Sequence, residues 1–244
     1  MRWQLMVGIR CGLVAIVAAG APAVRAQERG IFVTPIPNAP FSATVRVERT
    51  DVQPNGNTLQ LWSEREIARD NEGRIYNEYR PFVPTTTKTV PDAIVIHLYD
   101  PRNRMTEYLY PKQKTYRMMI LNRPPATDTP DDFASPTAAA APQSEFTRQE
   151  DLGFRTIVGL QVHGVRMTQT LTAAESGTGQ KVTVTNEYWY SDVLRLNLAT
   201  THNDPRSGSV TMTVTQIDRG EPSAALFGVP AGYAMAGMAK PMGN

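Results

Sequence analysis

Apolar and polar side chains alternate along most of this chain, and a period of two is the pattern of β-strands with one buried face. The apolar side chains of residues 41–47 fall at every second position, and the same period recurs in residues 94–98, 182–190 and 210–214. Val and Thr dominate these stretches, as suits a pleated, half-buried surface. Residues 59–70 also fit a helix, but their start alternates and we predict a strand. The sequence therefore predicts a mainly β fold built on an antiparallel sheet.

Turn signals separate the expected strands. Asn55-Gly56 has the residues that a tight hairpin needs at positive φ, and Gly73 ends a second turn at residues 69–74. Asp100-Pro101-Arg102 and Asp204-Pro205-Arg206 place a proline after an aspartate, which is typical of a turn start. A further turn is expected at residues 176–181. A short helical turn at residues 221–227 completes the expected elements, so we predict one or two short helices.

The N-terminus has the three parts of a secretory signal peptide. Arg2 and Arg10 provide a basic start, an apolar run follows, and small residues precede a cleavage site near Ala26-Gln27. The apolar run is shorter than the about 20 residues of a membrane span, so we do not expect an integral membrane protein. Cys11 lies in this peptide, so the mature chain has no thiol and no disulfide. We predict periplasmic or secreted localisation.

Charge excludes one class of partner. The whole chain has 25 basic and 23 acidic residues, but the signal peptide contributes Arg2, Arg10 and Arg25 and no acid. The mature chain then has 22 basic against 23 acidic residues, a net charge of −1. Such a chain lacks the basic footprint of a nucleic-acid-binding protein. We expect no nucleic acid partner.

Domain organisation follows from one compositional break. Residues 122–144 are rich in Pro, Ala, Thr and Asp and almost free of large apolar side chains, so they cannot bury enough surface to offset their ordering entropy. We predict one β-rich domain over residues 27–233, interrupted by this flexible excursion. Residues 234–244 are predicted to form a loose tail.

The histidines give little support for catalysis. His97 lies in an expected strand without a second ligand at a metal-binding spacing, and His163 lies in a glycine-kinked strand or turn. His202, with Asp192 and Asp204 near it in sequence, suggests a hydrolytic or metal site, but no positioned nucleophile or third ligand accompanies them. We predict no catalytic residues, no metal site and no cofactor.

Aromatic and methionine residues give the one positive indication of function. A curved sheet with such residues on its concave side can hold an apolar guest, although the same residues also build ordinary cores. The candidate ligand-binding residues on the concave face are Tyr99, Tyr108, Tyr110, Met119, Tyr188, Tyr190 and Met212.

Several motifs resemble a family of exported, uncharacterised bacterial proteins that is frequent in acidobacteria. The matching pieces are Phe41 to Ala43, Arg49-Thr50, Asn55-Gly56, Arg69-Asp70, Gly73-Arg74, Asp100-Pro101, Tyr108 to Pro111, Lys114-Thr115, Glu187 to Ser191, Asp204 to Arg206, Gly208, Ile217, Arg219, Glu221-Pro222 and residues 226–233. That family has no settled activity, so the resemblance implies no catalytic residue. The closing residues 226–233 also resemble the end of periplasmic lipoprotein-carrier-like proteins, which implies a half-barrel sheet sheltering a hydrophobic cavity.

Three functions remain open at this stage. The first is a non-enzymatic periplasmic binding or carrier protein, with a lipid or lipoprotein acyl chain on the concave face. The second is an envelope protein-interaction or regulatory module without a small ligand, and the third is a hydrolase centred on His202.

Overall fold

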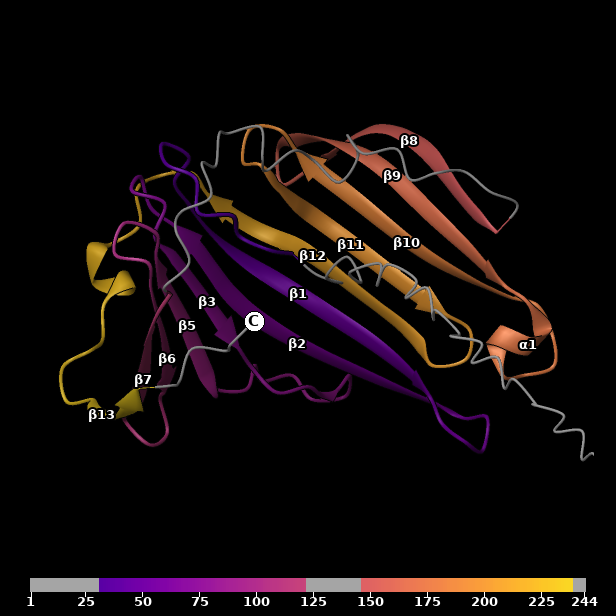
Figure 1. Ribbon diagram of the computed structural model, residues 1–244, viewed down its shortest axis with the longest axis horizontal. Helices are drawn as coiled ribbons and strands as arrows, with labels where there is room; N and C mark the ends of the chain where they lie inside the picture. Colours follow the sequence, from indigo (N-terminus) through magenta and orange to yellow (C-terminus); the bar gives the residue numbers. More distant parts are fainter. Residues whose placement is uncertain (1–30, 122–145, 239–244) are drawn as a thin grey trace, which may run out of the picture.

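The computed structural model describes residues 31–121 and 146–238, and its strands form one curved, open sheet (Figure 1). The sheet has 13 strands in the order β13-β7-β6-β5-β3-β2-β1-β12-β11-β10-β9-β8, and β4 pairs with β2 off this path. The strands are β1 (Phe41–Val52), β2 (Thr58–Arg69), β3 (Ile75–Tyr79), β4 (Val83–Pro84), β5 (Val95–Asp100), β6 (Met105–Tyr110), β7 (Thr115–Ile120), β8 (Thr147–Ile157), β9 (Leu160–Leu171), β10 (Val182–Ser191), β11 (Leu196–Asp204), β12 (Gly208–Asp218) and β13 (Ala234–Met238).

This architecture confirms the predicted mainly β fold with a curved antiparallel sheet and shows that the sheet is open, which the sequence left undecided. Residues 58–69, which also suited a helix, form β2. Gly56 and Gly73 both have φ of 82° and close the two predicted hairpins. The helical content of the described residues is α1 (Ala173–Ser176) and the 3-10 helix η2 (Ala224–Phe227). Among these residues, no helix is both long and apolar enough to cross a membrane.

The two faces of the sheet pack against different parts of the chain. On the outer face, Tyr76, Leu98 and Leu109 form a cluster with Phe227 of η2, which lies outside the curve of the sheet (Figure 1). The opposite face is the inner face of the sheet. Its core consists of alternate residues of β1, residues of other strands and residues of the segment that precedes β1. The members of this cluster are Ile31, Phe41, Ala43, Val45, Val47, Ile67, Leu160, Val162, Leu194, Leu196, Leu198 and Val214.

The buried guanidinium of Arg69 fastens three segments together at the end of β2. Its Nε donates to the Ala39 carbonyl at 2.8 Å, one Nη to the Thr34 carbonyl at 2.9 Å, and the other Nη to the Leu194 carbonyl at 2.7 Å. The side chain is fully buried and lies 5.1 Å from the ring of Phe41. Burial lowers the pKa of Arg69 to about 10. These bonds hold the segment before β1 and the β10–β11 turn against the sheet.

The structure can be compared with one of the two predictions on chain organisation. The predicted loose tail at residues 234–244 is wrong for its first part, because Ala234–Met238 form β13, a parallel partner of β7. Backbone groups make this pairing, and the segment Ala-Met-Ala-Gly-Met has no alternation of apolar and polar side chains, so it gave no strand signal. The predicted excursion at residues 122–144 lies outside the described residues, as do the predicted signal peptide and residues 239–244.

Candidate functional site

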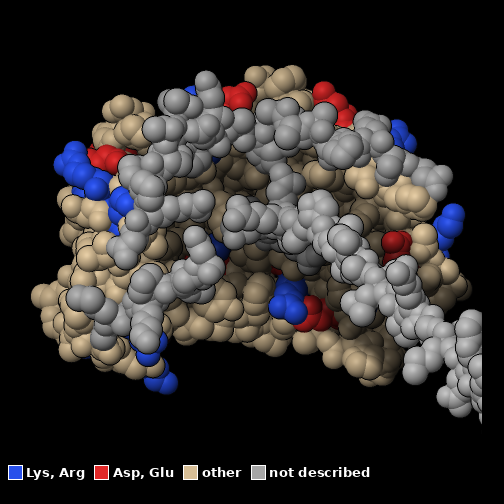
Figure 2. Space-filling model, in the orientation of Figure 1, with Lys and Arg blue, Asp and Glu red and all other residues tan. Residues whose placement is uncertain are grey.

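The inner face of β3, β5, β6 and β7 forms one wall of the curved sheet. The register sets its residues opposite one another without interruption from β3 to β7. Tyr76 and Leu98 point outward towards η2, so their neighbours along each strand point inward. The inward residues of this wall are Ile75, Asn77, Tyr79, Val95, His97, Tyr99, Thr106, Tyr108, Tyr110, Thr115, Arg117 and Met119. Figure 2 shows the hollow of the sheet as a whole, where uncharged residues form most of the surface that is not grey.

One row of this wall combines aromatic and polar groups. Asn77 lies opposite His97, His97 opposite Tyr108, and Tyr108 opposite Arg117. The rings of His97 and Tyr108 stack with centroids 4.9 Å apart and an interplanar angle of 21°. His97 Nε2 lies 2.6 Å from the Thr106 hydroxyl, and burial lowers the pKa of His97. The stacked pair is therefore a neutral, rigid platform near neutral pH.

A second row of the wall is more apolar. Ile75 lies opposite Tyr99, Tyr99 opposite Thr106, and Thr106 opposite Met119. Tyr99 and Met119 are partly exposed, and so are Tyr108 and Tyr110 in the neighbouring rows. The wall therefore offers accessible aromatic and thioether groups beside a polar row, an arrangement suited to an amphiphilic ligand.

The structure divides the seven predicted ligand-binding residues into two groups. Tyr99, Tyr108, Tyr110 and Met119 are neighbours in β5, β6 and β7. The other three, Tyr188, Tyr190 and Met212, lie in β10 and β12, with β3, β2 and β1 between the groups.

The second group takes part in packing. Tyr188 and Tyr190 are 6% and 7% exposed, so little of either ring is accessible. Met212 packs against the inner core, and its sulfur lies 3.8 Å from an Arg65 nitrogen. The wall residues of β5 to β7 are consequently the more accessible part of the predicted set.

Sequence reasoning singled out neither Asn77 nor Arg117, and it treated His97 as an ordinary strand residue. The available signal was alternation: His97 and Tyr99 share a face of β5, and Tyr108 and Tyr110 share a face of β6. Which residues face one another across strands depends on the register, and alternation within one strand does not give it.

The residues of the hydrolase hypothesis do not form a triad. His202 Nδ1 lies 2.8 Å from the Asn186 side-chain oxygen, and Asp204 bonds Arg206 through both carboxylate oxygens. The Arg206 hydrogen bonds lower the pKa of Asp204. Asp192 lies in the turn before β11, whereas Asp204 ends that strand. Within the described residues, no three His, Cys, Asp or Glu side chains could hold a metal ion.

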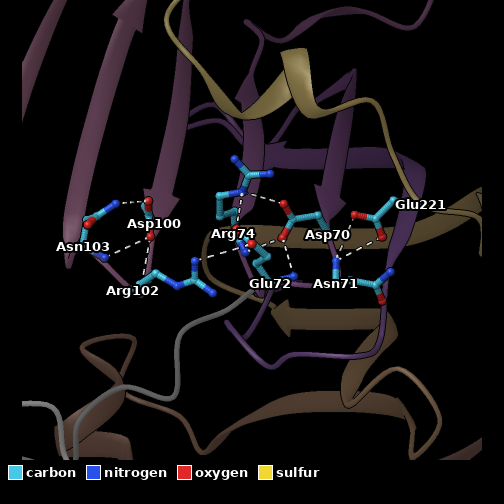
Figure 3. A network of polar contacts seen from close by, with 8 residues as sticks. All are labelled: Asp70, Asn71, Glu72, Arg74, Asp100, Arg102, Asn103 and Glu221. Carbon is cyan, nitrogen blue, oxygen red and sulfur yellow. Dashed lines mark hydrogen bonds and ion pairs between the residues drawn. The ribbon is translucent and has the colours of Figure 1, made fainter.

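The carboxylates at the end of β2 have a structural role. Asp70 accepts hydrogen bonds from the backbone nitrogens of Glu72 and Arg74 and from Arg74 Nε at 2.6 Å. Figure 3 shows how this turn joins the β5–β6 turn and the segment after β12, through Asp70, Asn71, Glu72, Arg74, Asp100, Arg102, Asn103 and Glu221. The Asp70 and Asp100 side chains stabilise the conformations of their own turns.

Comparison with known proteins yields similarities to solved structures only. No protein-family model and no curated protein matches the sequence. The solved structures include the MucA/MucB complex of Pseudomonas aeruginosa, at 12% identity and a TM-score of 0.39, which covers 80% of this chain and 56% of that one. A LolA superfamily protein of Nitrosomonas europaea has 11% identity and a TM-score of 0.32, covering 79% of this chain and 91% of that one.

Lipoprotein LppX of Mycobacterium tuberculosis has 11% identity and a TM-score of 0.26, covering 74% of this chain and 88% of that one. This chain thus spans little more than half of the MucB chain. Lipoprotein-carrier-like proteins are among these structures, and the exported acidobacterial family is not shown by any of them. What this chain binds has to be inferred from its own geometry.

Proposed function

We propose that this protein is a non-enzymatic binding or carrier protein of the cell envelope that holds a lipid or lipoprotein acyl chain against the inner face of its sheet. The observation that supports this most directly is the partly exposed group of Tyr99, Tyr108, Tyr110 and Met119 on one wall. Aromatic rings and a thioether adapt well to flexible hydrocarbon.

Lipid binding by the purified mature protein tests this proposal. The protein should bind a fluorescent fatty acid saturably. Mass spectrometry should detect lipid that co-purifies with the protein under gentle conditions. Met119→Asp places a charge on the apolar row and should weaken binding at least tenfold, because a charge in contact with hydrocarbon is strongly disfavoured. Met235→Asp, at an exposed site of β13, is the matched control. If neither saturable binding nor co-purified lipid is found, the proposal is wrong.

A second candidate is an envelope protein-interaction module, and the β8 edge favours it. Among the described strands, β8 stands at the end of the sheet order beside β9, and edge strands are a common place for strand addition by a partner. Phe154 on this edge strand is 67% exposed. A defined partner should co-precipitate with the wild type and not with Phe154→Ser. Tyr79→Ser, which changes an exposed aromatic residue elsewhere, should retain it.

A further inference from the structure

Four strands of the wall end or begin at the side that lies lowest in Figure 1. Tyr79 ends β3 and Tyr110 ends β6, opposite the first residues of β5 and β7. Beyond these strand ends the chain continues in residues 80–94, which join β3 to β5 through β4, and in residues 111–114, the β6–β7 turn. These two segments, together with Tyr79, form what we call the lower edge.

Unpaired basic side chains are concentrated at the lower edge. Three of the four lysines in the described part of the chain lie there and are exposed, namely Lys88, Lys112 and Lys114. Within the described residues none of them has an ion-pair partner. The charge of Arg80 is balanced by a carboxylate of β3, so three lysines against Asp92 leave this edge with a net charge of +2. Figure 2 shows basic and no acidic side chains at the lower left, where Figure 1 places the β6–β7 turn.

Apolar side chains are exposed at the same edge. Tyr79 is 52% exposed and Ile94 is 45% exposed. The Ile94 backbone nitrogen donates to the Tyr79 carbonyl at 2.9 Å, so the two residues are adjacent. Val90, in the same connection, is 38% exposed. Single exposed apolar residues are ordinary, but an adjacent pair beside unpaired lysines has the composition of a contact with a membrane surface.

The apolar pair and the basic turn are close enough to touch one surface together. Tyr79 ends β3, and the β6–β7 turn begins two strands away, after β5 and β6. Neighbouring strands are about 4.8 Å apart, so this separation is about 10 Å across the sheet. A lipid surface offers negative head groups and an apolar interior over any such distance, and its attraction for basic side chains acts within a Debye length.

We propose that the lower edge docks on an anionic lipid surface. Its three lysines lie among the head groups, and Tyr79 and Ile94 reach the boundary with the acyl chains. Tyr110 lies at the same edge and belongs to the accessible residues of the inner wall, so a lipid leaving the membrane here meets that wall directly. This inference rests on the proposed function, because it names the surface from which the bound lipid is taken.

Vesicle binding by the mature protein tests the docking surface. The protein is sedimented with vesicles of phosphatidylcholine alone and of phosphatidylcholine mixed with phosphatidylglycerol. Only the mixed vesicles should bind it, and about 0.5 M salt, which shortens the screening length to about 4 Å, should abolish this binding. The Lys112→Gln, Lys114→Gln double variant should weaken it about 25-fold, because each lysine near an anionic surface contributes about fivefold. Lys88→Gln should weaken it about fivefold, and Lys181→Gln, at the exposed lysine before β10, is the control.

Insertion of the apolar pair is followed with a fluorescent label. Cys11 is the one cysteine of the sequence and lies in the expected signal peptide, so the mature protein accepts a single engineered thiol. An environment-sensitive dye on Ile94→Cys should shift to the blue when mixed vesicles are added. The same dye on Val193→Cys, at a 55% exposed site in the β10–β11 turn, is the matched control and should not shift. Circular dichroism shows that each variant is folded.

The results separate the docking surface from the carrier function. If mixed vesicles bind no better than phosphatidylcholine vesicles, or if the double lysine variant binds like the wild type, the docking surface is wrong. Saturable binding of a fatty acid in solution would then still support the carrier function. If the lysine variants lose binding but the dye at position 94 does not shift, the proposed contact of the apolar pair is wrong. Loss of vesicle binding in the lysine variants, with a blue shift at position 94 and none at position 193, would establish the surface.

Discussion

Replacement of Arg69 by methionine is the most informative test of what holds this sheet in shape. The guanidinium donates to three backbone carbonyls, of Thr34, Ala39 and Leu194, at 2.7 to 2.9 Å. The side chain is completely buried, so water cannot replace these donors without opening the structure. Methionine has a similar length and fills most of the volume. The variant thus removes the donors while most of the packing is retained.

The expected loss follows from the three carbonyls. An unpaired buried acceptor costs about 1–3 kcal/mol, and removal of the buried charge recovers part of this cost. We expect Arg69→Met to lower the free energy of unfolding by about 3 kcal/mol. With a urea m-value of about 2 kcal/mol/M, the midpoint of unfolding moves down by about 1.5 M.

Arg69→Lys should recover less than half of this loss, because one ammonium group cannot reach three carbonyls that lie around a planar fork. The matched control is Arg102→Met, which changes an arginine whose side chain is 75% exposed and should leave the midpoint within about 0.3 M. Urea unfolding followed by tryptophan fluorescence measures all three variants. An Arg69→Met protein within about 1 kcal/mol of the wild type would refute the view that this cation fastens the three segments.

Three further predictions concern single positions in the sheet. Gly164→Ala should destabilise the protein by about 1–3 kcal/mol in thermal or urea unfolding, because a Cβ there would lie 2.5 Å from the Trp189 ring. Asn77→Leu should raise the free energy of unfolding by about 1 kcal/mol, since it removes an unpaired buried acceptor, and no gain would mean that this acceptor is satisfied. The pKa of Asp204 is lowered in the folded state by Arg206, so its contribution to stability is present above the unfolded pKa and is lost as pH falls through the folded pKa. Asp204→Asn should therefore weaken the dependence of unfolding on pH below about 4, as followed by fluorescence in an acid titration.

Much of the sheet could be predicted because its strands alternate cleanly. In β10, Val184, Tyr188 and Tyr190 were expected on one face, and all three are buried there. In β12, Val214 was expected inward and is 1% exposed, while Thr215 was expected outward and is exposed. A strand with one buried face has apolar side chains at every second position. This pattern can be recognised in the sequence without knowing the partner strand.

Other elements left no such signal. β13 is held by backbone pairing with β7, and α1 is a single turn closed by a capping box in which Thr172 and Glu175 bond each other reciprocally. A strand stabilised at an edge needs no apolar periodicity, and a single turn is too short to show any. Hydrophobic patterning therefore predicts the interior of the sheet better than its edges and connections.

The candidate site was predictable only in part, and the reason is geometric. Tyr99, Tyr108 and Met119 could be chosen from composition and alternation, because aromatic and thioether side chains suit an apolar guest wherever they lie. The row of polar residues from Asn77 to Arg117 could not be predicted. These two residues are 40 positions apart in the chain, and they lie on the same face only because three strand registers align. A shift of one residue in the β6–β7 register would turn Arg117 to the face that carries Glu107. Which side chains face one another across strands thus depends on register, whereas the suitability of a single side chain for an apolar guest depends on its type, and only the second can be read from a single sequence.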